Sequence, residues 1–172
     1  MLILLPVTCM ADKKLDEIDI KILAALQGDG RLTNAALAQQ VGLSATPCLE
    51  RIKRLERDGF IEGYTARLNP ALLGAALLVF VEVTIERTSE DVFGNFHASV
   101  LKLPEVLECH MVAGGFDYLL KVRVRDMAAY RSFLGTALSV LPGVRETHTY
   151  VVMEEVKSTT ALPLKLPPHE PR

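Results

Sequence analysis

The stretch LSATPCLERIKRLERDGF, residues 43–60, decides the fold of the first part of the chain. Ser44 can cap a helix there, and Pro47 is tolerated in its first turn because that position needs no helical N–H. Its apolar residues recur at helical spacing and form one inner stripe, Cys48, Ile52 and Leu55. Asp58-Gly59 ends the pattern. The stretch therefore predicts a helix with one apolar side and several charged sides.

Two shorter helices are predicted before this stretch and a β-ribbon after it. The first helix follows Asp16-Glu17 and ends at Gly28-Asp29-Gly30, with an apolar stripe of Ile18, Ile22, Leu23 and Leu26. The second begins at Thr33 or Asn34 and carries Leu37, Ala38 and Val41. Gly42 supplies the turn, and residues 60–68 suggest a ribbon that bends at Gly63. Residues 15–68 are therefore predicted to form a winged helix-turn-helix.

The long helix also carries a local excess of positive charge. Between Arg51 and Arg57 there are four basic residues and one acid, Glu56, a balance that favours contact with DNA phosphates. A solvated helix face is the alternative, and the net charge of −2 weighs mildly against a nucleic-acid binder. The capped helices and the Gly42 turn favour DNA binding. The candidate DNA-binding residues are Asn34, Ser44, Thr46, Arg51, Lys53, Arg54 and Arg57.

After a linker at residues 69–74, the pattern changes to strands alternating with helices. Residues 77–86 read as a strand with one apolar face, made of Val79, Val81, Val83 and Ile85. Strands are also predicted at 106–113, 118–124 and 144–156, with helices at 88–103 and 126–141. Leu103-Pro104-Glu105-Val106 and Leu141-Pro142-Gly143-Val144 repeat a helix end followed by a strand start. Residues 75–160 are therefore predicted to form a ferredoxin-like βαββαβ domain, which makes the whole chain α+β.

The remaining features mainly exclude functions. Residues 1–14 are expected to be a disordered tail or to contain a mis-assigned start, with translation beginning at Met10. The Pro-rich residues 161–172 are expected to be a flexible tail. Cys9, Cys48 and Cys109 lie far apart and suggest no metal site. No stretch is long enough for a membrane helix. No catalytic residue, metal or cofactor is predicted, so an enzyme on this scaffold rests on fold analogy alone.

A third possibility is a ligand-sensing module whose helix-turn-helix binds protein and not DNA. The basic stretch from Arg51 to Arg57 argues against it. The salt dependence of binding would separate the two functions, because phosphate contacts produce a steep slope.

Several long runs, in order, resemble the Lrp/AsnC family of feast/famine regulators. They are residues 43–51, 54–61, 78–82, 108–110, 116–121 and 149–156, within a match that extends from about residue 15 to residue 160. The resemblance implies a cytoplasmic, nucleoid-associated transcriptional regulator that binds double-stranded promoter DNA. It also implies homodimers that assemble into octamers or similar assemblies, and a small amino acid as effector. Leucine is the expected effector, with methionine or alanine as alternatives.

The resemblance places the effector between dimers, near the turn at residues 113–118. Asp117 could accept a hydrogen bond from the ammonium group of an amino acid, and the glycine N–H groups could approach its carboxylate. A tight turn in which Asp117 has only a capping role is the alternative. The candidate effector-binding residues are Met111, Gly114, Gly115, Asp117, Tyr118, Met127, Tyr150 and Val152.

Overall fold

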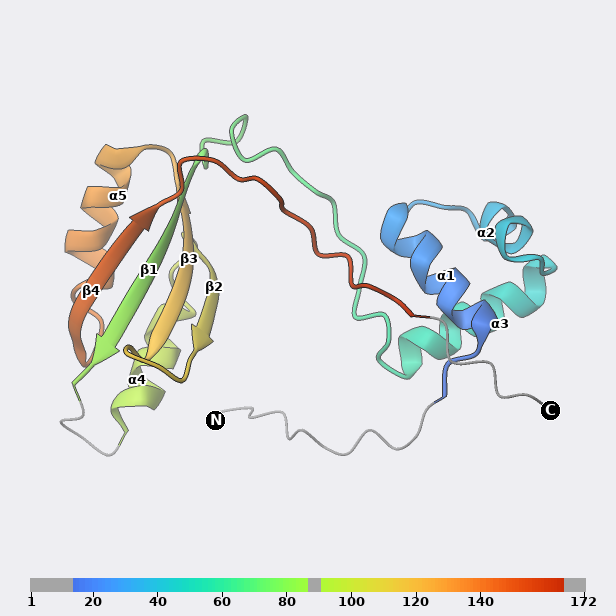
Figure 1. The fold of residues 1–172 in the computed structure, drawn as a ribbon, viewed down its shortest axis with the longest axis horizontal. Coiled ribbons are helices and arrows are strands. Elements are labelled where there is room, and N and C mark those ends of the chain that lie inside the picture. The colour runs from blue at the N-terminus through green and yellow to red at the C-terminus, as the bar shows by residue number, and fades with distance from the viewer. Residues whose placement is uncertain (1–13, 87–90, 166–172) are drawn as a thin grey trace. The chain divides into compact units, whose positions relative to one another are not determined.

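The computed structural model describes residues 14–86 and 91–165, which form two compact units (Figure 1). Leu68–Lys157 forms one unit. Of the described residues, 14–67 form the other, together with 158–165. The residues expected to precede a start at Met10, Cys9, and most of the predicted Pro-rich tail lie outside the described residues.

Three helices make up the N-terminal unit: α1 (Glu17–Gly28), α2 (Asn34–Val41) and α3 (Ala45–Arg57). Thr33 caps α2 by accepting from the N–H of Ala36. Gly42 has a φ of 75°, a left-handed conformation that glycine adopts without strain and that turns the chain into α3. The apolar sides of the three helices meet in one core, formed by Ile22, Leu23, Leu37, Ala38, Val41, Cys48 and Leu55.

The β-ribbon predicted for residues 60–68 does not form in this chain, where no strand is assigned to those residues. Gly63 is not among the glycines with positive φ, so the tight two-residue turn that such a hairpin favours is absent. Phe60 and Ile61 instead pack against the helical core. The helix-turn-helix is thus present, while its wing is an irregular segment.

The segment after Lys157 differs from the flexible tail expected beyond residue 160. The side-chain amide of Gln27 donates to the Leu162 carbonyl at 3.1 Å and accepts from the Leu162 N–H at 2.6 Å. Leu164 is partly buried against the helical core. Two contacts of different kinds therefore attach this segment to the N-terminal unit.

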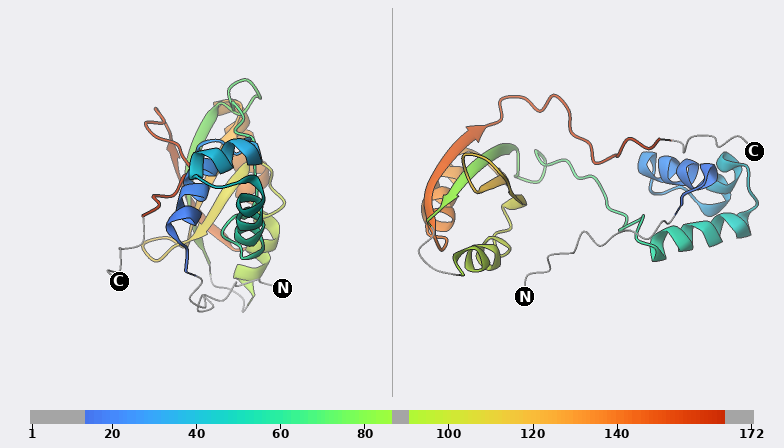
Figure 2. Two further views of the ribbon diagram at one scale, coloured as in Figure 1. Left: turned by 90° about the vertical axis from the view of Figure 1, so that its right-hand side faces the viewer. Right: turned by 60° about the horizontal axis from the view of Figure 1, so that its bottom comes forward.

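The C-terminal unit is a four-stranded antiparallel sheet with helices on one face (Figures 1 and 2). Its strands lie in the order β2-β3-β1-β4. The predicted βαββαβ order is confirmed, in the sequence β1 (Leu77–Ile85), α4 (Val92–Val100), β2 (Val106–Met111), β3 (Tyr118–Val124), α5 (Met127–Phe133), the π-helical turn η1 (Leu134–Leu138) and β4 (Val144–Val151).

The core of this unit lies between the sheet and its helices. The predicted apolar face of β1 is fully inside, with Val79, Val81, Val83 and Ile85 all buried. Phe96 of α4 and Tyr130 of α5 pack onto it. Two predicted strands end early, at Met111 and at Val151, and the predicted helix start at residues 88–90 lies outside the described residues.

Candidate DNA interface and effector site

The outward face of α3 is the candidate DNA interface. Helical spacing turns the buried Cys48 and Leu55 inward, so residues offset from them by about half a turn point to solvent. Those residues are Thr46, Leu49, Glu50, Lys53 and Arg57, and all are exposed. Ser44, at the N-cap, is exposed too and makes no side-chain capping bond, so its hydroxyl remains available to a ligand.

Arg51 and Arg54 lie on the side of α3 that faces α1. Arg51 Nη1 contacts Asp16 Oδ2 at 2.6 Å and Asp19 Oδ1 at 2.8 Å, and Arg54 Nη2 contacts Asp19 Oδ2 at 2.5 Å. Asp19 is completely buried. We call Asp16, Asp19, Arg51 and Arg54 the α1–α3 ion network. Two of the predicted DNA-binding residues are therefore engaged inside the domain.

The charges of this network strengthen one another. Burial opposes ionisation of Asp16, but the hydrogen bond from the Asp19 N–H and the guanidinium of Arg51 outweigh it and lower the pKa of Asp16. The hydrogen bond to Asp16 raises the pKa of Arg51. Both shifts favour the charged forms of Asp16 and Arg51 at neutral pH.

Asn34 also has a structural contact. Its amide donates to the Ala45 carbonyl at 2.8 Å and so joins the start of α2 to the start of α3. Its Oδ1 atom is buried and has no hydrogen-bond partner among the described residues. The seven predicted DNA-binding residues therefore divide into an outward group (Ser44, Thr46, Lys53 and Arg57) and an inward group (Asn34, Arg51 and Arg54).

The turn between β2 and β3 is the candidate effector site. Asp117 Oδ2 accepts from the backbone N–H of Ile85 at 2.7 Å, and the Asp117 N–H donates to the Val83 carbonyl. Gly114 and Gly115 are exposed, and a Cβ on either would meet open space. Asp117 thus has a structural contact with the neighbouring strand β1, which is not the turn cap of the tight-turn alternative, and the two glycines leave the turn open to a ligand.

Tyr118 does not face the solvent. It is 1% exposed, and its hydroxyl lies 2.6 Å from Nε2 of His97 on α4. Burial raises the pKa of Tyr118 to about 12. The phenol therefore belongs to the core, and only its backbone is placed near the turn.

The other candidate effector residues are spread along the sheet from one end to the other. Met111 pairs with Tyr118 at the turn end, whereas Met127 begins α5 after the other end of β3. Six strand steps of about 3.4 Å put these ends roughly 20 Å apart. Tyr150 pairs with Phe80, midway between these ends, and the Val152 N–H donates to the Leu78 carbonyl, nearer the Met127 end. One chain therefore does not gather all the predicted residues into a single pocket.

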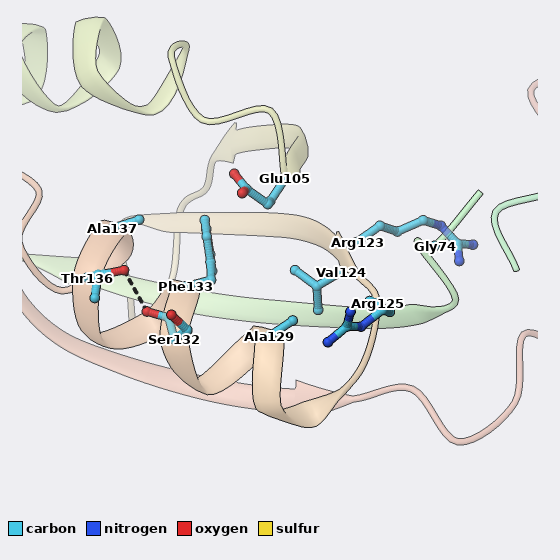
Figure 3. A pocket seen from close by; sticks show the side chains of 10 residues that line it. All are labelled: Gly74, Glu105, Arg123, Val124, Arg125, Ala129, Ser132, Phe133, Thr136 and Ala137. Carbon is cyan, nitrogen blue, oxygen red and sulfur yellow. Dashed lines mark hydrogen bonds between the residues drawn. The ribbon is translucent and has the colours of Figure 1, made fainter.

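A cavity of about 420 Å³ lies beside α5, and none of the candidate effector residues lines it. In Figure 3, Ser132, Thr136 and Ala137 stand on one wall and Glu105, which precedes β2, on another. Arg125, in this lining, is paired at 2.8 Å with Asp126.

Through the described part of the chain there is no group of three or more potential metal-binding side chains. No helix in that part is long and apolar enough to cross a membrane.

A helix-turn-helix unit joined to a separate sheet domain defines a class, the transcriptional regulators that couple a DNA-binding domain to a ligand-binding domain. Comparison with known families agrees for both units. Residues 15–62 match the model for winged helix-turn-helix DNA-binding domains, and residues 78–162 match the model for the Lrp/AsnC ligand binding domain. This chain belongs to the Lrp/AsnC family.

Curated relatives give the same result. The leucine-responsive regulatory proteins of Salmonella typhimurium and Escherichia coli K12 are each 61% identical to this chain over 153 residues. Each alignment covers 89% of this chain and 93% of the relative. The family resemblance drawn from the sequence is therefore confirmed over nearly the whole chain.

Solved structures confirm the fold. A transcriptional regulator of Neisseria meningitidis, crystallised with L-methionine, is 43% identical and superposes with a TM-score of 0.84, covering 87% of this chain and 97% of that one. An AsnC family regulator of Agrobacterium tumefaciens is 39% identical, with a TM-score of 0.82 and the same coverage.

The sequence analysis missed the α1–α3 ion network, although a signal for it was present. Asp16 and Asp19 are three residues apart on one helix, and Arg51 and Arg54 are three residues apart on another. Residues at this spacing share one helix face, so the two pairs can meet wherever the helices pack together. Counting basic residues alone assigned both arginines to DNA.

Proposed function

We propose that this chain regulates transcription in the cytoplasm, on the nucleoid, by binding double-stranded promoter DNA with the outward face of α3. The observation that carries the proposal is the arrangement of α3 itself. Its inner residues are fixed to α1 and α2, while Thr46, Lys53 and Arg57 stay exposed along one side. Such a helix can enter a major groove with its polar side chains directed at the DNA.

A small amino acid is proposed to control this binding. Leucine is the first choice, because the curated relatives are named leucine-responsive. Methionine is the second, since the regulator of Neisseria meningitidis was crystallised with it, and alanine is the third. The relatives are named as regulators and not as enzymes, which supports a role without catalysis.

Assembly of several copies, as dimers that build octamers or similar assemblies, is part of the same proposal. Within one chain, the candidate residues at the turn and those near Met127 lie at opposite ends of the sheet. A second copy would bring the missing residues to each group. The sheet face without helices also carries the exposed Tyr150 next to Phe80, an apolar surface that a second copy could cover.

The test is a pull-down of the organism's sheared genomic DNA with the purified protein, in the presence or absence of millimolar leucine. Discrete promoter fragments whose recovery changes with leucine are expected. Methionine and alanine are added in parallel, and the fragments recovered serve as probes in binding titrations. No enrichment under any condition would refute the DNA-binding proposal.

The effector half of the proposal has its own test. Tyr150→Ala removes an exposed side chain from a candidate effector position, whereas Val140→Ala removes a comparably exposed apolar side chain elsewhere in the same unit. We expect the amino-acid response to fall in the first variant and to persist in the second, with DNA binding retained in both. An equal response in the two variants would place the effector elsewhere.

A further inference from the structure

The α1–α3 ion network joins two structural tasks in one set of side chains. Asp16 Oδ1 accepts from the Asp19 N–H at 2.8 Å, and Asp19 Oδ2 accepts from the Asp16 N–H at 3.0 Å, which forms a capping box at the start of α1. Both carboxylates also bind Arg51 of α3. The same two acids thus fix the start of α1 and one side of the helix proposed to enter the groove.

Exposure divides the basic residues of α3 into two pairs. The side chains of Lys53 and Arg57 are 61% and 72% exposed, whereas those of Arg51 and Arg54 are 39% exposed or less. The first pair has only looser contacts with carboxylates, Lys53 Nζ at 4.0 Å from Glu50 Oε1 and Arg57 Nε at 3.4 Å from Asp58 Oδ1, so phosphates have access to it. To reach a phosphate, the second pair would have to leave carboxylates that are already within hydrogen-bond distance.

We propose that Asp16 and Asp19 are positioning residues for DNA recognition, which hold Arg51 and Arg54 away from the phosphates so that these arginines orient α3. This inference rests on the proposed DNA-binding function of α3. It makes the acids determinants of specificity, because phosphate contacts add affinity without reading sequence. A released arginine would add such a contact and loosen the orientation of the helix.

Burial gives the network its strength. Asp19 is 1% exposed at its side chain, and a buried carboxylate is stable only when it is paired and hydrogen-bonded. Arg51 and Arg54 supply those bonds, so withdrawing both to the DNA would leave Asp19 buried and unpaired. The geometry therefore favours retention of the network when DNA binds.

The test measures how the DNA-binding constant depends on salt. Each phosphate contact contributes about −0.9 to the slope of log K against log salt concentration. Two duplexes are used: one selected by the protein from a random-sequence library, and a scrambled duplex of the same composition. The variants are Asp16→Asn and Asp19→Asn, each of which replaces a carboxylate by an amide of nearly equal shape.

Asp29→Asn is the matched control, because it removes one acid from the same unit at an exposed turn and can keep the bond accepted from the Arg31 N–H. Asp16→Asn keeps the proposal testable even if Asp19→Asn does not fold. Its side chain is half exposed, and the Oδ1 atom that caps α1 is retained.

Release of Arg54, whose carboxylate partner is Asp19, is expected to steepen the slope by about one in Asp19→Asn, on both duplexes, and not in Asp29→Asn. Asp16→Asn weakens the hold on Arg51 but leaves it on Asp19, so a smaller steepening is expected there. The preference for the selected duplex is expected to fall. Adding Arg51→Gln to Asp16→Asn, or Arg54→Gln to Asp19→Asn, should restore the wild-type slope. A purely structural role would leave the slope unchanged, since stability alters the amount of active protein and not its phosphate contacts.

An unchanged slope in both Asp variants would overturn the inference, and so would a flatter slope in Arg51→Gln or Arg54→Gln alone. The latter result would show that the arginines bind phosphates directly. Lys53→Ala and Arg57→Ala test the underlying function separately, because each should flatten the slope by about one. If neither does, the proposed DNA surface on α3 fails, whatever the role of the acids.

Discussion

The N-terminal and C-terminal units differ in the interactions that stabilise each of them internally. In the described part of the chain, Asp19 is the one buried charged residue, and it lies in the helical N-terminal unit. The C-terminal unit instead buries an apolar layer between sheet and helices, centred on residues such as Val81, Phe96 and Leu120. The smaller unit thus adds ion pairs with a buried carboxylate to its apolar core, whereas ion pairs of the larger unit, such as those of Lys121 with Glu108 and of Arg123 with Glu155, involve exposed carboxylates.

This difference matches what each unit does. An apolar core excludes water but tolerates repacking, because dispersion contacts have little directional preference. Hydrogen-bonded ion pairs are directional, and those of Arg51 and Arg54 are satisfied in one arrangement of α3 against α1. A helix that must present particular side chains to DNA gains from that directionality.

The largest expected effect lies in the packed unit. Phe96 is fully buried, and its ring centroid is 4.6 Å from that of Tyr118. Phe96→Ala is expected to lower the free energy of unfolding of this unit by about 3–5 kcal/mol, through lost burial and the cavity left behind. Urea denaturation combined with hydrogen exchange measures the loss for each unit separately.

Leu101→Ala is the control for this prediction, because Leu101 lies just after α4 and is 85% exposed. Its expected effect is within about 0.5 kcal/mol. A similar loss in both variants would show that burial does not decide stability in this unit.

The next effect lies in the ion network. Arg51→Ala combined with Arg54→Ala leaves Asp19 buried without either guanidinium, and is expected to destabilise the N-terminal unit by about 3 kcal/mol. Hydrogen exchange of α1 and α3 amides checks this. Lys53→Ala with Arg57→Ala removes the same charge from exposed positions and should change stability by less than about 1 kcal/mol. Equal losses would contradict an internal role for the arginines.

The fold was predictable from the sequence wherever one residue pattern has one structural solution. The alternation in β1 and the stripe in α3 predict their buried faces because periods of 2 and 3.6 residues belong to different structures. The ribbon after Phe60 was not predictable, since a glycine between apolar residues permits a hairpin but does not require it. The π-helical turn η1 had no signal of its own in the sequence.

The site was predictable only in part, because residue type does not reveal the partner. Arg51 and Lys53 are equally basic in the sequence, yet one faces Asp19 and the other faces solvent. Tyr118 and Asp117 are neighbours, yet the phenol is buried against His97. The candidate effector residues Met111 and Met127 were predicted as one site, yet the fold of one chain places them at opposite ends of β3, a separation that residue type does not reveal.

A smaller effect concerns the C-terminal segment. Truncation after Lys157 removes the hydrogen bonds between Gln27 and Leu162 and the packing of Leu164, and is expected to destabilise the N-terminal unit by about 1–2 kcal/mol. Truncation after Lys165 keeps both contacts and serves as the control. Thermal unfolding followed by circular dichroism compares the two. If both truncations behave like the full chain, the segment does not contribute to the stability of this unit.

The smallest effect is the pH dependence of the ion network. The pKa of Asp16 is lowered from its usual value of 3.8, so its stabilising contribution is present above that value and is lost as the pH falls through the lower, folded-state pKa. Because its side chain is half exposed, Asp16→Asn is expected to cost only about 0.5–1 kcal/mol at about pH 7. Urea titrations from about pH 7 to about pH 3 should show the gap between wild type and variant closing toward the acid end. Asp29→Asn, measured alongside, accounts for the loss of one negative charge. A gap that stays constant or widens at low pH would mean that the Asp16 carboxylate does not stabilise α1 against α3 through its charge.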